Sequence, residues 1–88
     1  MRFRVRYVGR VQGVGFRATA VALADTFAVT GWVRNELDGS VLLEAQGDEG
    51  EVEGFLGRIE QVLGRNIEAA RRHPLDDVAG ETRFRIAR

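Results

Sequence analysis

The stretch "GRVQGVGFR", residues 9–17, contains three glycines and ends at an arginine, Arg17. It follows "RFRVRYV", residues 2–8, where arginines alternate with apolar residues in the period-2 pattern of a strand with one buried face. It precedes "FRATAVALADTFA", residues 16–28, whose apolar residues recur at helical spacing. These nine residues therefore predict a pliable loop that leads the chain from a strand into a helix.

The second quarter of the chain predicts a β-hairpin. The stretches "VTGWVRN", residues 29–35, and "VLLEAQG", residues 41–47, are typical of strands, and Asp38-Gly39 between them is a strong hairpin-turn signal. Alternation places Gly31, Val33 and Asn35 on one face of the first strand and Trp32, Arg34 and Glu36 on the other.

An amphipathic helix is expected next. Asp48 and Glu51 have the spacing of a capping box, and Gly64 suits the end of the helix. The apolar stripe comprises Val52, Phe55, Leu56, Ile59, Val62 and Leu63. Two further strand patterns follow, "NIEAARRH" over residues 66–73 and "ETRFRIAR" over residues 81–88.

The order β-α-β-β-α-β predicts a ferredoxin-like α+β sandwich, in which two helices cover one face of a four-stranded antiparallel sheet. The arginines of the first strand, Arg2, Arg4 and Arg6, would then lie on the opposite, solvated face. At 88 residues, we expect residues 1–88 to form a single domain.

Composition argues against several classes of protein. The chain has no cysteine and one histidine, His73, so we expect no metal site and no cofactor. No apolar run approaches the ~20 residues needed to cross a bilayer, and we expect a monomeric cytoplasmic protein that binds no membrane.

Charge is unevenly distributed although the net charge is zero. The first 24 residues hold five arginines and no acid, whereas residues 36–53 hold seven acids and no base. Two interpretations stay open: solvated faces of opposite sign, or a basic end that faces an anion.

The glycine-rich loop has the properties of an anion site. Glycine permits positive φ and lets backbone N–H groups point inward, and the loop enters a helix N-terminus, which favours negative charge. Arg17, in the first turn, opposes the helix dipole unless an anion lies beside it, and phosphate suits its planar fork of donors. A purely structural turn is the alternative. The spacing matches neither a Walker loop nor a dinucleotide fingerprint.

Asn35 is the second candidate, because its amide can donate and accept and so hold a water. An asparagine before a turn can equally bond the turn backbone.

Together these stretches resemble the acylphosphatase family. "GRVQGVGFR" is similar to its first signature, Gly-x-Val-Gln-Gly-Val-x-Phe-Arg. "GWVRNELDGSVLLEAQG", residues 31–47, is similar to its second: Gly-aromatic-Val-basic-Asn, three residues, Gly-x-Val, five residues, Gly. The resemblance implies an enzyme that hydrolyses the carboxyl–phosphate bond of a small-molecule acyl phosphate, with Arg17 as catalytic phosphate ligand and Asn35 positioning the water. The phosphate-binding loop would comprise Gln12, Gly13, Val14, Gly15, Phe16 and Arg17.

Two departures from the animal enzymes of the family stand out. Glu36 follows Asn35, and alternation should direct it away from the phosphate. The chain ends "FRIAR", where many relatives end in tyrosine, with no expected catalytic consequence.

Two other functions stay open: a non-catalytic phosphate- or RNA-binding ferredoxin-like module, or a specialised domain of the kind found in hydrogenase-maturation proteins. We expect no nucleic-acid partner, since Phe3 and Tyr7 alternate toward the buried side rather than the open face.

Overall fold

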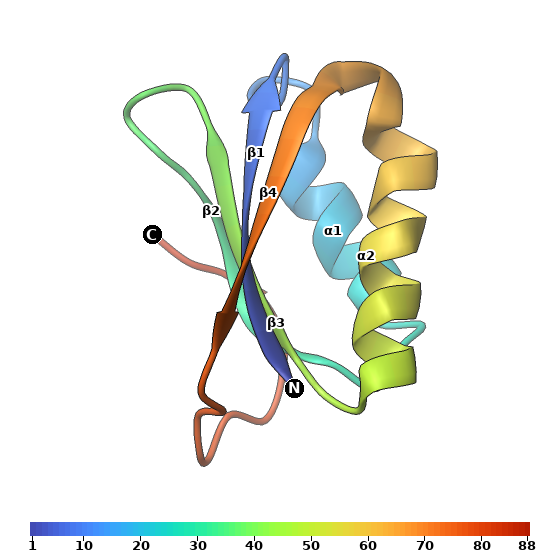
Figure 1. The fold of residues 1–88 in the computed structure, drawn as a ribbon. Helices are drawn as coiled ribbons and strands as arrows, with labels where there is room; N and C mark the ends of the chain where they lie inside the picture. Colours follow the sequence, from blue (N-terminus) through green and yellow to red (C-terminus); the bar gives the residue numbers. More distant parts are fainter.

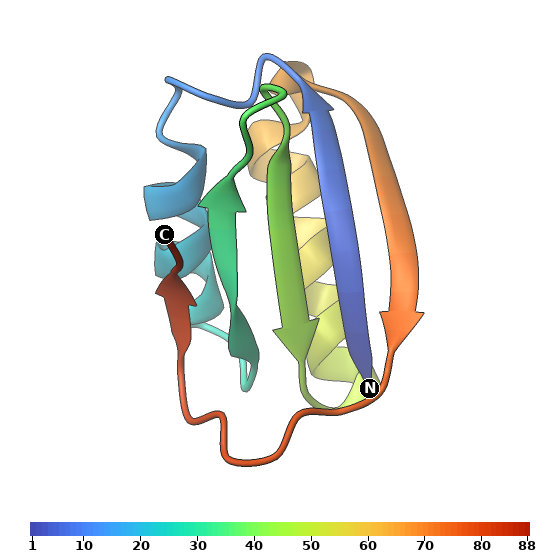
Figure 2. The same ribbon diagram turned by 90° about the vertical axis from the view of Figure 1, so that its left-hand side faces the viewer.

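A five-stranded sheet with two helices on one of its faces makes up the protein (Figures 1 and 2). The computed structural model describes residues 1–88. Its elements are β1 (Arg2–Gly9), α1 (Phe16–Ala24), β2 (Thr30–Asn35), β3 (Val41–Gln46), α2 (Glu49–Leu63), a 3₁₀ turn (Gly64–Asn66), β4 (Ile67–Leu75) and β5 (Phe84–Ile86). Neither helix is long and apolar enough to cross a membrane.

The predicted ferredoxin-like α+β fold is confirmed, with one difference in the sheet. The strand order is β4-β1-β3-β2-β5, and β5 pairs in parallel with β2. The sheet therefore has five strands and is mixed, whereas the prediction was four strands, all antiparallel. The difference arises because β4 already occupies the position beside β1. The last strand therefore pairs with the free edge of β2, where the Ala87 N–H donates to the Val33 carbonyl at 2.9 Å.

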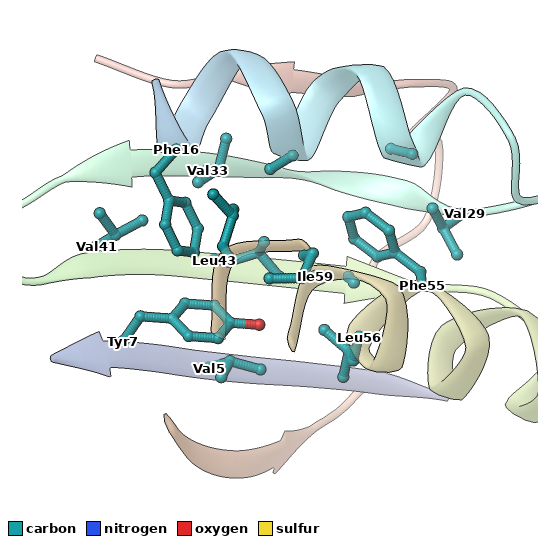
Figure 3. Packing of buried hydrophobic residues seen from close by; sticks show 14 of the residues in the cluster. Val5, Tyr7, Phe16, Val29, Val33, Val41, Leu43, Phe55, Leu56 and Ile59 are labelled. Atoms are coloured by element: carbon teal, nitrogen blue, oxygen red, sulfur yellow. The ribbon is translucent and has the colours of Figure 1, made fainter. Parts of the chain in front are cut away.

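The core lies between the sheet and the helices (Figure 3). Tyr7 of β1 packs on Phe16 of α1 with ring centroids 5.0 Å apart, and Phe55 of α2 packs edge-on against Phe84 of β5 at 5.1 Å. The predicted stripe of α2 is confirmed except for Val62, which is exposed; the buried members are Val52, Phe55, Leu56, Ile59 and Leu63.

The predicted helix ends need correction. The first helix ends at Ala24 rather than at residue 28. Asp48 occupies the N-cap of α2, but its side chain makes no capping hydrogen bond. The prediction of a capping box is therefore wrong. Glu51 instead accepts a hydrogen bond from the Ala28 N–H at 2.7 Å, which ties the turn after α1 to the start of α2.

The arginines of β1 lie on the open face of the sheet, but Arg2 is not solvated as expected. Its residue surface is only 3 % exposed. Its guanidinium donates to Glu44 of β3 at 2.8 Å and to Glu81 at 2.8 Å. Glu81 belongs to the connection between β4 and β5, which crosses the end of the sheet (Figure 2). This long connection supplies the carboxylate that completes the burial of Arg2.

Candidate active site

A pocket of about 670 Å³ brings together three parts of the chain that are far apart in the sequence. They are the glycine-rich loop with the start of α1, the end of β2, and the end of β5 with the two residues that follow it. The lining residues are Val11, Gly13, Gly15, Phe16, Arg17, Ala18, Asn35, Ile86, Ala87 and Arg88. No acidic side chain lines it.

The loop reaches the pocket through two glycines in the left-handed region, Gly13 with φ of 76° and Gly15 with φ of 77°. A Cβ at either position would meet open space, so the requirement for glycine is conformational rather than steric. Gly15 is the N-cap of α1, and no side chain caps the helix or brings negative charge to its first turn. The N–H groups of that turn therefore have no side-chain partner and can receive an anion.

Arg17 extends from the first turn of α1 into the same pocket. Its side chain is exposed and forms neither an ion pair nor a hydrogen bond with another side chain. A cation at a helix N-terminus is unfavourable on its own. An anion between Arg17 and the loop amides would reverse that balance.

Asn35 ends β2, and its side chain makes no hydrogen bond inside the protein. The turn that follows is held by Asp38, whose Oδ1 accepts from the Ser40 N–H at 2.9 Å and from the Ser40 hydroxyl at 2.6 Å. The hydroxyl bond and then the backbone bond lower the pKa of Asp38. The turn-capping interpretation therefore applies to Asp38 rather than to Asn35. The Asn35 amide is free to bind a ligand beside Arg17.

Gln12 shapes the site without lining the pocket. Its side-chain nitrogen donates to the Glu36 carbonyl at 2.8 Å and to the Ser40 carbonyl at 2.9 Å. These bonds fasten the loop to the hairpin that carries Asn35. Val14 is 43 % exposed and also lies outside the pocket lining.

Glu36 pairs with Arg34 at 3.1 Å and does not line the pocket, as strand alternation predicted.

The sequence interpretation missed the wall of the pocket that comes from the end of the chain. Of the predicted loop residues, Gly13, Gly15, Phe16 and Arg17 line the pocket, but so do Ile86, Ala87 and Arg88. The alternation in "FRIAR" indicated a strand, yet no local signal reveals that it pairs in parallel with β2. That pairing, with Ile86 opposite Val33, carries the last residues to the pocket.

No group of three or more metal-ligating side chains is present. The fold and the pocket thus define a small α+β protein whose candidate site combines a glycine loop, a helix N-terminus, an arginine and an asparagine. A match to the Acylphosphatase family covers residues 3–86, and the chain belongs to that family.

Relatives of known name agree with this assignment. An acylphosphatase of Oceanobacillus iheyensis is 52 % identical over 58 residues, which are 66 % of this chain and 64 % of that protein. The matched segment thus spans just under two thirds of that relative. An acylphosphatase of Latilactobacillus sakei is 38 % identical over 80 residues, 89 % of this chain and 87 % of that protein. The crystal structure of acylphosphatase from Bacillus subtilis superimposes with a TM-score of 0.88 at 29 % identity, covering 99 % of this chain and 98 % of that one.

Proposed function

We propose that this protein is an acylphosphatase, an enzyme that hydrolyses an acyl phosphate to a carboxylate and inorganic phosphate. One observation carries the proposal. Arg17 and Asn35, distant in the sequence and both without a side-chain partner, line one pocket together with the positive-φ glycines Gly13 and Gly15.

In this proposal the loop amides and the fork of Arg17 bind the oxygens of the phosphoryl group. The Asn35 amide holds a water in line with the bond between phosphorus and the acyl oxygen. The water oxygen forms a bond to phosphorus, the acyl oxygen leaves with the bonding electrons as a carboxylate, and the water proton passes to a phosphoryl oxygen. A carboxylate is a good leaving group, so positioning and charge stabilisation can supply most of the rate.

The rest of the pocket offers a surface for the acyl group. Val11, Ala18 and Ile86 line it with apolar atoms, and they come from the loop, α1 and the last strand. We further propose that the protein is a cytoplasmic monomer and that the reaction requires no metal or cofactor.

The test is hydrolysis of benzoyl phosphate, with chelator present and with p-nitrophenyl phosphate as a monoester control. Wild type should hydrolyse only the acyl phosphate. Arg17→Ala should lower kcat/KM by about 10²–10³ and raise KM, while Asn35→Ala should lower kcat by a similar factor with little change in KM. The control is Arg65→Ala, since Arg65 is exposed and lies outside the pocket.

A folded wild type that binds phosphate but does not hydrolyse benzoyl phosphate would overturn the enzyme proposal and leave the loop as an anion receptor. An Arg17→Ala or Asn35→Ala variant with wild-type kinetics would refute the role given to that residue.

A further inference from the structure

A second pocket, of about 290 Å³, lies on the open face of the sheet, over the neighbouring strands β1 and β4. Figure 2 shows this face toward the viewer, with β1 in blue beside β4 in orange. The lining residues are Arg4, Arg6, Leu42, Arg71, Arg72 and His73. None of them is acidic, and none lines the candidate active site.

The strand register sets basic side chains against each other in this pocket. Arg6 of β1 is paired with Arg71 of β4, and Arg4 is paired with His73. Like charges directly opposite on one face of a sheet are destabilising. The next position beyond Arg6 is Leu42 of β3, followed by Arg34 of β2, so this row across the sheet contains three arginines and no acid.

Neighbouring carboxylates neutralise only part of the charge. Glu44 is shared, with Oε1 accepting from Arg2 and Oε2 from Arg4, each at 2.8 Å. Its two oxygens are thus engaged by Arg2 and Arg4, and neither oxygen pairs with Arg6.

The remaining guanidiniums are less well matched. Arg6 donates to the Ser40 hydroxyl at 2.8 Å and lies 3.6 Å from a carboxylate oxygen of Asp38, which is well exposed. Arg72 turns toward the helix side, where it pairs with Glu53 of α2 at 2.6 Å. Arg71 forms no ion pair and no side-chain hydrogen bond. Arg71 is therefore the one arginine of the pocket without a carboxylate partner, and it lies opposite Arg6, whose carboxylate partner Asp38 is exposed.

We propose that this pocket binds a small anion with two adjacent phosphoryl groups, a diphosphate. Arginine forks recognise phosphoryl oxygens in pairs, and Arg6 and Arg71, directly opposite each other on strands ~4.8 Å apart, place two forks beside one short polyanion. The volume of about 290 Å³ lies just below the ~300–1,000 Å³ typical of ligand pockets, which suits a ligand of this size.

A nucleic acid is the competing ligand with the same phosphate chemistry. Single-strand binders combine basic grooves with aromatic side chains on which bases stack. No aromatic residue lines this pocket, and its one apolar side chain is Leu42. The pocket therefore favours the diphosphate itself over a stacked strand.

The experiment is calorimetric titration of sodium pyrophosphate into the Arg17→Ala protein, so that the glycine loop contributes little. We expect one site, with binding weakened at least tenfold by adding Arg71→Gln and unchanged by adding Arg58→Gln, which removes an equal charge from exposed Arg58 on α2. Orthophosphate should bind at least tenfold more weakly than pyrophosphate. Amide NMR shifts should cluster at residues 4–6 and 71–73.

The proposal is overturned by binding that survives Arg71→Gln, by binding weakened equally by Arg58→Gln, or by shifts that fall outside β1 and β4. Tighter binding of oligouridylate than of pyrophosphate, lost with Arg71→Gln, would reassign the surface to nucleic acid. In the Arg17-intact protein, Arg71→Gln should keep full benzoyl phosphate hydrolysis and an unchanged or higher Tm, which separates loss of binding from misfolding. The result does not depend on the proposed catalytic function.

Discussion

The side-chain amide of Gln12 donates to the carbonyl oxygen of Ser40 at 2.9 Å and so joins the glycine loop to the β2–β3 hairpin. Arg17 lies at the end of the glycine loop, and Asn35 lies just before the hairpin turn. This hydrogen bond therefore connects the segment that carries Arg17 to the segment that carries Asn35. The same nitrogen also donates to the Glu36 carbonyl. The relative position of Arg17 and Asn35 therefore depends on a residue that does not line the pocket.

Gln12→Ala should loosen that connection. Loss of two hydrogen bonds at about 0.5–1.5 kcal/mol each should lower the free energy of unfolding by roughly 1–3 kcal/mol. Benzoyl phosphate hydrolysis should fall by about tenfold or more, because small displacements of catalytic groups are costly. Denaturant unfolding and steady-state kinetics measure the two effects. Gln61→Ala, on the exposed side of α2, is the control. Wild-type kinetics in Gln12→Ala would show that the connection is not needed.

Gly15→Ala should destabilise the protein by about 1–2 kcal/mol, because an L-residue at φ of 77° is strained although there is space for the methyl group. Gly57→Ala, in the interior of α2 with open space around it, should stabilise the protein by about 0.5–1 kcal/mol. Thermal or denaturant unfolding of the two variants should thus shift in opposite directions. A shift in the same direction would contradict the conformational argument.

Tyr7 should make the protein sensitive to alkaline pH. Burial raises the pKa of its hydroxyl above the ordinary value of 10.0. Above pH 10 the unfolded chain loses this proton while the folded chain retains it, so stability falls with rising pH by up to about 1.4 kcal/mol per pH unit. Urea unfolding between pH 9 and 11.5 should show a fall that is smaller in Tyr7→Phe. If stability fell equally with pH in wild type and Tyr7→Phe, Tyr7 would not be the group responsible.

Glu81 should contribute stability at neutral pH that is lost in acid. Burial alone would raise the pKa of this carboxyl, but the hydrogen bonds from Arg2, the nearby Thr30 hydroxyl, and the charges of Arg2 and Arg85 lower it below its ordinary 4.5. Because the pKa of Glu81 is lower in the folded protein than in the unfolded chain, its contribution to the free energy of unfolding is complete above the unfolded-state pKa. That contribution disappears as pH falls through the folded-state pKa. Glu81→Gln should therefore lower stability by roughly 1–2 kcal/mol at pH 7.

The difference between wild type and Glu81→Gln should shrink steadily below about pH 4.5, as measured by urea unfolding at a series of pH values. Glu49→Gln, exposed at the start of α2, is the control. A difference that persists at low pH would mean that shape rather than charge is responsible.

Much of the candidate site is predictable from the sequence because each of its two signatures lies within one short stretch of chain. Gly13, Gly15, Phe16 and Arg17 were predicted from one stretch of nine residues, and the structure brings them into one pocket. Asn35 was ambiguous from sequence, since an asparagine before a turn can bond the turn or a ligand. Only the hydrogen bonds of Asp38 show that the turn is already satisfied without Asn35.

What the sequence determined by itself is what repeats over a few residues. Period-2 alternation in β1, helical periodicity in α2 and the Asp38-Gly39 turn each depend on local backbone geometry, so the elements and their buried faces followed from pattern alone. The tertiary structure decided which distant segments meet. The parallel pairing of β5 with β2 and the burial of Arg2 against Glu81 both depend on where a long connection brings the chain back. Those contacts join residues separated by most of the chain, and no short-range periodicity encodes them.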